Sequence, residues 1–480
     1  MKKKIPDTFY YYFSYALIPV FGLLQTKILT SVLSNNDFGK IQLITPLIDW
    51  LVLIVGLGAP QYVIRFYSRD GIEIYRKALF SSIVTFLILG LLGSVFTIIF
   101  GIHYGDLTIN VWIFFLFLFA VLGQQIMALI IALLRGQEHH IFYNSTSVIS
   151  KLFFVGGAII GILYFSVNPV EGYLLGTSIA TFMLLLFLSL FFKLNQFWKM
   201  KLPSWENIKS MVSYGLPIIG IMLMGNLLPN FNRYVIFSDL GTLDVGKYVI
   251  GTMMAMLCLQ ILYEPLITVL HPRVFRLWEN ENKEEVRRII SNYLNIYIII
   301  GLLVCGLSAR HEEFLIKILA NSSYFMPIGC FIMLLLANFT LGIYRLVSIH
   351  FYLVKSTLEL CVCFAISILA SILSAFLLVG RAGLLGAAFS VLIGSILLTA
   401  TVWFRGRENL KIRLIPKYHI IAFLIVIIYI LSPLIFSSES PFIFGLIDAS
   451  ISLVITAGLG YLLINLYNKE YTLGKNKWRS

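Results

Sequence analysis

Runs of about twenty apolar residues, separated by short polar breaks, follow one another along almost the whole chain. An α-helix of about 20 apolar residues crosses a bilayer core of ~30 Å, so each run predicts one membrane span. Hydrophobic residues make up 59% of the chain and charged residues only 12%, which excludes a water-soluble globular protein of this size. We therefore predict an all-α polytopic membrane protein with about fourteen transmembrane helices, at residues 10–33, 41–64, 78–100, 111–134, 145–165, 173–192, 211–236, 249–270, 293–309, 326–345, 358–379, 385–404, 420–436 and 445–466.

Two of these runs, 293–309 and 358–379, are weaker, so a count of twelve or thirteen helices stays open. The basic residues test the count. With the N-terminus placed in the cytoplasm, the inside loops hold 28 of the 36 Lys and Arg residues, the outside loops hold five, and the spans hold Lys27, Lys151 and Arg233. Basic residues accumulate in the cytoplasmic loops of membrane proteins. We therefore predict that both termini are cytoplasmic, and that the net charge of +13 reflects topology rather than nucleic-acid binding.

The cysteines and histidines show none of the spacings that are typical of metal sites or disulfide frameworks. All five cysteines lie inside apolar runs, where small buried apolar residues are expected. No outer loop is long enough to form a catalytic domain. The sequence therefore predicts no catalytic residue, no metal site and no cofactor.

One small polar signature occurs twice. The stretch NNDFGKIQLI starts at Asn35 and TLDVGKYVIG starts at Thr242, with D-x-G-K in both, 207 residues apart. Six predicted spans separate the copies, an even number, so both copies have the same polarity across the membrane. Parallel repeats of this kind occur in secondary transporters. We predict two homologous six-helix lobes with a glycine turn after the first helix of each, and divide the chain into an N-lobe (1–192), an inter-lobe loop (193–210), a C-lobe (211–404) and a last helix pair with its tail (405–480).

Ionisable groups inside the spans are the first candidates for a site, because each costs ~2.5–3.5 kcal/mol in a lipid-facing position. Lys27 and Asp49 are predicted at equal depth on the first two helices. Asn226, Asn230 and Arg233 align at i, i+4 and i+7 on the seventh helix, which Pro229 is expected to kink. They predict a cationic cavity that suits an anionic head group. Two alternatives stay open: Lys27 and Asp49 neutralise each other between packed helices, or Arg233 extends to the outer interface.

Further polar side chains lie within the spans without a charge partner in the pattern. Interhelical hydrogen bonding is the main alternative to a cavity role for most of them. For the acid near the cytoplasmic end of the eighth span, the alternatives are a gate and a solvated carboxylate. These secondary candidates are Gln124, Gln125, Gln260, Glu264 and Asn338.

The two repeated stretches resemble those of a known family. LTSVLSNNDFGKIQLI resembles the L-x-x-x-L-x-x-x-x-F-G-x-Y stretch of polysaccharide-biosynthesis flippases, and NRYVIFSDLGTLDVGKYVIG resembles their D-R-x-x-I-x-x-x-L-G-x-x-x-x-G-x-Y stretch. These are the Wzx-type members of the multidrug/oligosaccharidyl-lipid/polysaccharide exporter superfamily. The chain departs from the pattern at Asn232, where the family has an acid, and at Ile41, where it favours Tyr.

The resemblance implies a flippase of the bacterial cytoplasmic membrane that carries an undecaprenyl-diphosphate-linked oligosaccharide to the outer leaflet by alternating access. It implies a V-shaped central cavity between the lobes, with Lys27 and Arg233 on the diphosphate or on acidic sugars. Expected partners are membrane lipids and the polysaccharide polymerase and chain-length machinery. Related exporters couple to Na⁺ or H⁺, and Asp49 is the candidate coupling carboxylate. Which glycan is carried, capsule or O-antigen among others, stays open.

Three other functions are weighed against this one. A multidrug or cation antiporter of the same superfamily needs acidic residues inside its lobes, whereas the predicted interior is cationic. An O-antigen polymerase or ligase needs a large outer loop with catalytic arginines, and no outer loop here has that size. A purely structural membrane scaffold does not require charges at matched depth in both halves.

Overall fold

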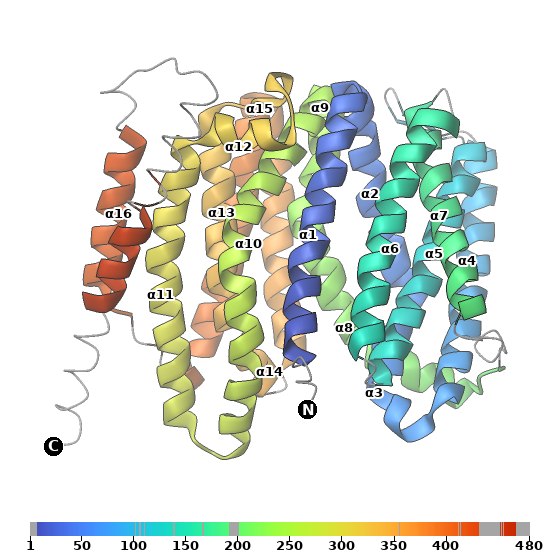
Figure 1. Ribbon diagram of the computed structural model, residues 1–480, viewed down its shortest axis with the longest axis horizontal. Coiled ribbons are helices and arrows are strands. Elements are labelled where there is room, and N and C mark those ends of the chain that lie inside the picture. The colour runs from blue at the N-terminus through green and yellow to red at the C-terminus, as the bar shows by residue number, and fades with distance from the viewer. Residues whose placement is uncertain are drawn as a thin grey trace, which may run out of the picture. The chain divides into compact units, whose positions relative to one another are not determined.

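The computed structural model describes residues 7–100, 102–104, 107–109, 111–137, 140–165, 168–191, 201–354, 356–410, 412, 414–431, 452, 454 and 456–466. The described elements are helices, apart from one two-stranded hairpin. The chain divides into two compact units, Met1–Asn230 with Gly241–Gly246, and Phe231–Leu240 with Lys247–Ser480. In Figure 1 the long helices within each unit run roughly side by side.

In the first unit, apolar side chains of α3, α4, α5, α7 and α8 form a buried cluster that includes Leu79, Leu129 and Leu184. The hairpin pairs Ile102 with Ile109 in antiparallel register. The elements are α1 (Asp7–Val32), α2 (Asn35–Gly56), α3 (Ala59–Asp70), α4 (Ile72–Phe100), β1 (Ile102–Tyr104), β2 (Leu107–Ile109), α5 (Val111–Gly136), α6 (His140–Ile160), the π-helix η1 (Gly161–Phe165), α7 (Pro169–Phe191) and α8 (Trp205–Asn230).

In the second unit α13 packs against α15 and α11, and α11 packs against α16. The start of α10 belongs to the first unit, and its residues from Lys247 onward belong to the second. The elements are α9 (Asn232–Leu240), α10 (Thr242–Glu279), α11 (Lys283–Arg310), α12 (Glu312–Leu319), the 3-10 helix η3 (Ser322–Tyr324), α13 (Ile328–Val347), α14 (Ile349–Leu353), α15 (Thr357–Leu410) and α16 (Pro416–Leu431).

Ten helices in the described part of the chain are long and apolar enough to cross a membrane, which makes this a multi-pass membrane protein. One of the ten, Thr357–Gly406, bends at Gly383 (φ 59°, ψ −138°), between the two spans predicted at 358–379 and 385–404. Residues 432–451, which include the end of the thirteenth predicted span and the start of the fourteenth, lie outside the described residues. The all-helical membrane fold is confirmed, and the count of fourteen stays a prediction.

The second predicted span, 41–64, has the wrong boundaries. Its helix, α2, begins at Asn35, where the Ser34 hydroxyl accepts the backbone N–H of Asp37 and caps the helix. The helix ends at Gly56, because Leu57 (φ 45°) and Gly58 (φ 75°) both take left-handed backbone conformations. The apolar run continues into α3, so hydropathy alone did not mark the break.

The glycines of the repeated signature do not form turns. Gly39 lies inside α2, and Gly246 lies inside α10. A Cβ at Gly39 would lie 2.0 Å from the backbone oxygen of Thr242, and the Thr242 hydroxyl donates to the Asn36 side chain. The predicted glycine turn is therefore wrong. At position 39 glycine is needed because the start of α10 packs directly on α2, so the two copies of the signature touch within the first unit.

Two glycine contacts hold helices of the first unit together at backbone distance. The first contact lies where α6 and η1 meet α7. A Cβ at Gly161, the first residue of η1, would lie 2.1 Å from the backbone oxygen of Gly172, and a Cβ at Gly176 would lie 2.0 Å from the backbone oxygen of Gly157. We call the contact of Gly157, Gly161, Gly172 and Gly176 the glycine seam. Small residues spaced four apart allow this approach between membrane helices.

The second glycine contact joins α8 to the break between α2 and α3. A Cβ at Gly58 would lie 2.3 Å from the Cα of Gly215. Near the same end, Tyr62 and Ser210 hydrogen-bond through their hydroxyls at 3.1 Å, and the Lys201 ammonium donates to Glu73 Oε2 at 2.6 Å. The helix α8 is therefore part of the first unit, although the predicted C-lobe starts at residue 211. The predicted lobe boundaries remain a prediction, and residues 192–200 of the loop region lie outside the described residues.

Candidate functional site

Asp49 lies at a point where side chains from four helices meet. Its carboxylate on α2 interacts electrostatically with Lys151 of α6 and with Tyr173 of α7. The Tyr173 hydroxyl lies within hydrogen-bonding reach of Thr45 on α2 and Gln25 on α1. Tyr173 is 3% exposed and Gln25 is 8% exposed, whereas Asp49 is exposed. We call these five residues the Asp49 cluster.

The cluster combines a carboxylate, an ammonium group and a phenol inside apolar helices. The Lys151 ammonium also lies 5.4 Å from the ring centroid of Phe154, and this ring packs edge-on against Tyr173 at 6.2 Å. The aromatic rings thus hold the cation beside the carboxylate. Such a group of side chains can neutralise its own charge or exchange a proton or a cation.

Lys151 was missing from the predicted site, although the signal was visible. It is one of only three basic residues within the predicted spans. The sequence pattern offered Lys27 as the partner of Asp49, because both were expected at the same depth. A single sequence does not reveal how the helices are arranged, so the electrostatic interaction of Asp49 with Lys151 came only from the structure.

Lys27 lies on the last two turns of α1 and is exposed. Thr30, three residues further along the same helix, is buried at 3% exposure, and its hydroxyl donates to the Lys27 carbonyl at 3.1 Å. Ser31 makes the same kind of bond to the Ile28 carbonyl at 2.7 Å. The two hydroxyls are therefore used within their own helix, and Lys27 is the charged group of this face.

The predicted stripe of Asn226, Asn230 and Arg233 does not follow one continuous helix. The helix α8 ends at Asn230, one residue after Pro229, and α9 begins at Asn232. The expected interruption at Pro229 is confirmed, but it also ends the periodicity on which the stripe depended. The Asn226 amide donates to Met222 O at 3.4 Å and the Asn230 amide to Asn226 O at 2.8 Å, so both bond their own helix backbone.

Arg233 is buried in the second unit, at 8% exposure. It interacts electrostatically with Tyr248 of α10, whose side chain is fully buried. The neighbouring Asn232, also fully buried, donates through its amide to Ala387 O at 2.9 Å and to Ser390 Oγ at 2.6 Å. The departure from the family pattern at Asn232 therefore places an anchor between α9 and α15, next to the arginine.

Glu264 lies near Arg345, a neighbour that the sequence pattern did not predict. The carboxylate on α10 interacts electrostatically with Arg345 at the end of α13, and both act on Tyr263. The two alternatives for Glu264, a gate and a solvated carboxylate, both stay open, because its interaction with Arg345 is electrostatic.

Of the four remaining secondary candidates, Gln125 and Asn338 fit interhelical or local hydrogen bonding. The Gln125 amide, 1% exposed, donates to Ser82 Oγ on α4 at 3.2 Å, and the Asn338 amide donates to Leu334 O at 2.8 Å. Gln124 and Gln260 are partly buried, and neither makes a hydrogen bond with the described residues.

Outside the predicted spans, the carboxyl groups with shifted pKa values include Glu312 and Glu73. Burial raises the pKa of Glu312, at the start of α12, to about 7, and the charge of Glu313 adds to this. The hydrogen bond from Lys201 lowers the pKa of Glu73. Among the described residues, no three His, Cys, Asp or Glu side chains gather in a way that could hold a metal ion.

A family model described as polysaccharide biosynthesis protein matches residues 5–278. None of the curated proteins matches this chain significantly.

Among solved structures, the lipid II flippase MurJ in an inward closed conformation is similar with a TM-score of 0.74 at 14% identity, over 98% of this chain and 100% of that chain. An inward-facing multidrug resistance MATE family transporter of the MOP superfamily has a TM-score of 0.61 at 16% identity, over 82% of this chain and 94% of that chain. An outward-facing transporter of the same description has a TM-score of 0.55 at 17% identity, over 83% of this chain and 93% of that chain. At these identities the likeness shows a common fold.

Proposed function

This chain belongs to the polysaccharide biosynthesis protein family, and from this premise we propose that it flips an undecaprenyl-diphosphate-linked oligosaccharide from the inner to the outer leaflet by alternating access. It is a membrane transporter of the flippase type rather than an enzyme. The observation that carries the substrate class is the set of cations within apolar helices, Lys27, Lys151 and Arg233. A diphosphate presents negative charge on closely spaced oxygens, which arginine and lysine neutralise with charge-assisted hydrogen bonds.

Arg233 is the better placed of the proposed diphosphate ligands. Its burial reduces screening by water, so its attraction for a phosphate is stronger than at an exposed position. The bonds of Asn232 to α15 fix the start of α9 and thereby the backbone of the neighbouring arginine. Lys27 is proposed as the second ligand, and the amides of Asn226 and Asn230 are proposed to contact the sugar hydroxyls. The lipid tail would stay in the bilayer.

Replacement of each of the two proposed diphosphate ligands by alanine tests this mechanism. We expect Arg233→Ala and Lys27→Ala each to abolish polysaccharide export, because the diphosphate would lose a charged ligand, while the membrane level of the protein stays unchanged. Lys247→Ala is the matched control, since it removes a lysine from the repeated signature without touching the proposed ligands. Export is measured as surface polysaccharide in a strain that lacks its own flippase. Full export by both variants would refute the cationic-ligand mechanism.

The Asp49 cluster supports a second candidate, a cation or multidrug antiporter. It contains a carboxylate within an apolar helix, and such a group can bind a proton, Na⁺ or a cationic substrate. The ammonium of Lys151 argues against binding of a cationic substrate, because it would compete with that substrate for the Asp49 carboxylate. We therefore propose that Asp49 couples flipping to H⁺ or Na⁺ and does not bind the cargo.

The proposal includes the setting of the protein. We place it in the bacterial cytoplasmic membrane with both termini in the cytoplasm, on the basis of its basic loops. The polysaccharide polymerase and chain-length machinery are proposed partners, because they would receive the flipped oligosaccharide. Which glycan is carried depends on enzymes that precede this step.

A further inference from the structure

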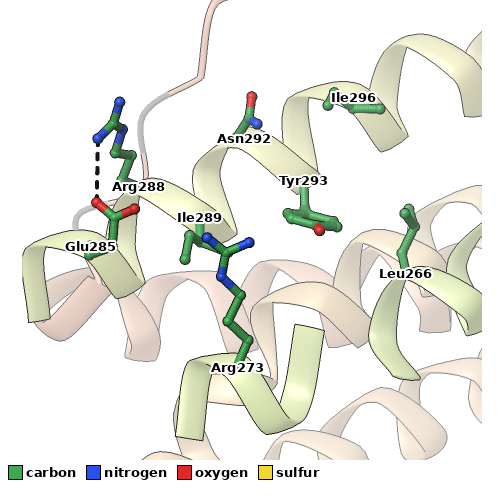
Figure 2. A pocket seen from close by; sticks show the side chains of 8 residues that line it. All are labelled: Leu266, Arg273, Glu285, Arg288, Ile289, Asn292, Tyr293 and Ile296. Atoms are coloured by element: carbon green, nitrogen blue, oxygen red, sulfur yellow. Dashed lines mark hydrogen bonds and ion pairs between the residues drawn. The ribbon is translucent and has the colours of Figure 1, made fainter. Parts of the chain in front are cut away.

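An open cavity of about 500 Å³ lies between α10 and α11 in the second unit (Figure 2). None of its residues belongs to the proposed substrate site. The lining comes from one face near the end of α10 and one face near the start of α11, and consists of Leu266, Arg273, Glu285, Arg288, Ile289, Asn292, Tyr293 and Ile296.

The lining changes from charged to apolar along the two helices. Figure 2 shows Arg273 and Arg288 toward one end, and Leu266 and Ile296 toward the other, with Tyr293 between them. At 1.5 Å per residue, Arg273 and Leu266 are ~10 Å apart along α10, and Arg288 and Ile296 are ~12 Å apart along α11. A ligand that fills the cavity therefore needs a polar part and an apolar part within that length.

The charged end has a net charge of +1. The Arg288 guanidinium forms an ion pair with Glu285 Oε2 at 3.4 Å, and the two charges compensate each other. Arg273 is exposed and makes no hydrogen bond or ion pair with the described residues. One guanidinium is therefore available to a monovalent anion, and a guanidinium binds phosphate oxygens in a bidentate manner.

Asn292 favours a ligand that carries a hydrogen-bond donor. Its Oδ1 atom is buried and has no hydrogen-bond partner within the described part of the chain. A buried acceptor without a partner costs about 1–3 kcal/mol. A ligand that carries a hydroxyl or ammonium hydrogen beside its phosphate would remove this cost, whereas an unsubstituted phosphate dianion would not.

The depth of the cavity matches the head groups of a bilayer. The helix α11 has 28 residues and is ~42 Å long, so it extends beyond a hydrocarbon core of ~30 Å. Arg288 lies ~8 Å from the start of this helix, next to the polar turn at 280–282, and Tyr293 is a residue type that favours the membrane interface. The cavity is thus open where lipid head groups lie.

We propose that this cavity binds the head group of an anionic glycerophospholipid. The phosphodiester accepts hydrogen bonds from Arg273 and Arg288, a head-group hydroxyl donates to Asn292 Oδ1, and the first acyl carbons lie against Leu266 and Ile296. A free organic phosphate shares the first two contacts but not the third, so the apolar end favours a lipid. Because α10 ends and α11 begins near the cavity, the bound lipid would fix the spacing of the two helices.

Native mass spectrometry of the full-length protein in detergent tests the site. The probes are phosphatidylglycerol, with one negative charge, phosphatidylcholine, with none, and glycerol 3-phosphate, which has no acyl chain. We expect phosphatidylglycerol to bind about fivefold more tightly than phosphatidylcholine. We expect Arg273→Gln to remove this preference and Asn292→Leu to weaken it. Arg276→Gln, which removes an exposed arginine one turn along the same helix, is expected to keep it.

Two results would overturn the proposal. One is equal retention of phosphatidylglycerol by Arg273→Gln and Arg276→Gln. The other is displacement of the lipid by glycerol 3-phosphate at similar concentration, which would assign the cavity to a soluble phosphate. Since Arg273 is exposed, its replacement is not expected to disturb folding, and an unchanged melting temperature of the variant checks this.

Discussion

Asp49 and Lys151 place opposite charges together inside the apolar helices of the first unit. Each charge lowers the cost of the other in a membrane, and removal of one leaves the second uncompensated. At the scale of a single residue, the charges of Asp49 and Lys151 therefore compensate each other, and binding of a proton or a sodium ion to Asp49 would disturb this compensation.

This balance predicts how Asp49→Asn behaves. Flipping by the wild type should depend on pH or on Na⁺, and the variant should lose that dependence, because an amide neither titrates nor binds Na⁺ well. The measurement is transport in proteoliposomes across a series of pH values and Na⁺ concentrations. Asp49→Asn combined with Lys151→Met is the control, since it restores a neutral pair and separates coupling from stability. An unchanged dependence in Asp49→Asn would remove this residue from the coupling role.

At the scale of elements, the glycine seam sets the distance between α6 and α7. Backbone oxygens occupy the space that a side chain would fill, so the helices cannot accept larger residues without moving apart. Overpacking of this kind typically costs about 1–3 kcal/mol. The neighbouring Gly156 provides a comparison, because a Cβ there would meet nothing within 4 Å.

We therefore expect opposite outcomes at adjacent positions of α6. Gly157→Val should lower the free energy of unfolding by about 1–3 kcal/mol, and Gly156→Val should change it little. Both replacements are equal in size and in helix propensity, so the difference isolates the seam. Thermal unfolding of the purified protein in detergent, followed by circular dichroism, gives the comparison. Equal melting temperatures would contradict a tight seam.

The elements also show what the sequence pattern could and could not predict. Apolar runs marked the helices well, and Pro229 marked the end of α8. The α2–α3 break could not be seen in hydropathy, because it depends on left-handed conformations at Leu57 and Gly58 within an apolar run. The four-residue spacing of Gly157 and Gly161, repeated at Gly172 and Gly176, is a signal for the seam that can be read from the sequence.

At the scale of the whole molecule, the basic loops predict the orientation in the membrane. With cytoplasmic termini, a cysteine at Glu171 should react with a membrane-impermeant maleimide added to intact cells, and one at Glu206 should not. The chain without its five native cysteines is the background, and permeabilised cells, in which both sites react, are the control. Labelling of position 206 alone in intact cells would mean the opposite orientation.

The all-helical membrane fold followed from the sequence because the apolar run that makes a membrane span is a local property. The site followed only in part. Lys27, Asp49 and Arg233 could be picked out as costly charges in apolar helices, but partners such as Lys151 and Arg345 depend on which helices are neighbours. The stripe of Asn226, Asn230 and Arg233 stays a prediction, and the structure adds that a helix break at Phe231 separates the two amides from the arginine.

The backbone contact between Gly58 and Gly215 has a mechanical consequence. The seventh long helix, α8, is fixed to the first unit by this contact and by the Tyr62–Ser210 and Glu73–Lys201 bonds. A movement of the first unit would therefore carry α8 with it as part of one rigid body. The chain passes from the first unit to the second at Asn230–Phe231, so a bend at this crossing would turn the backbone directly beside Arg233.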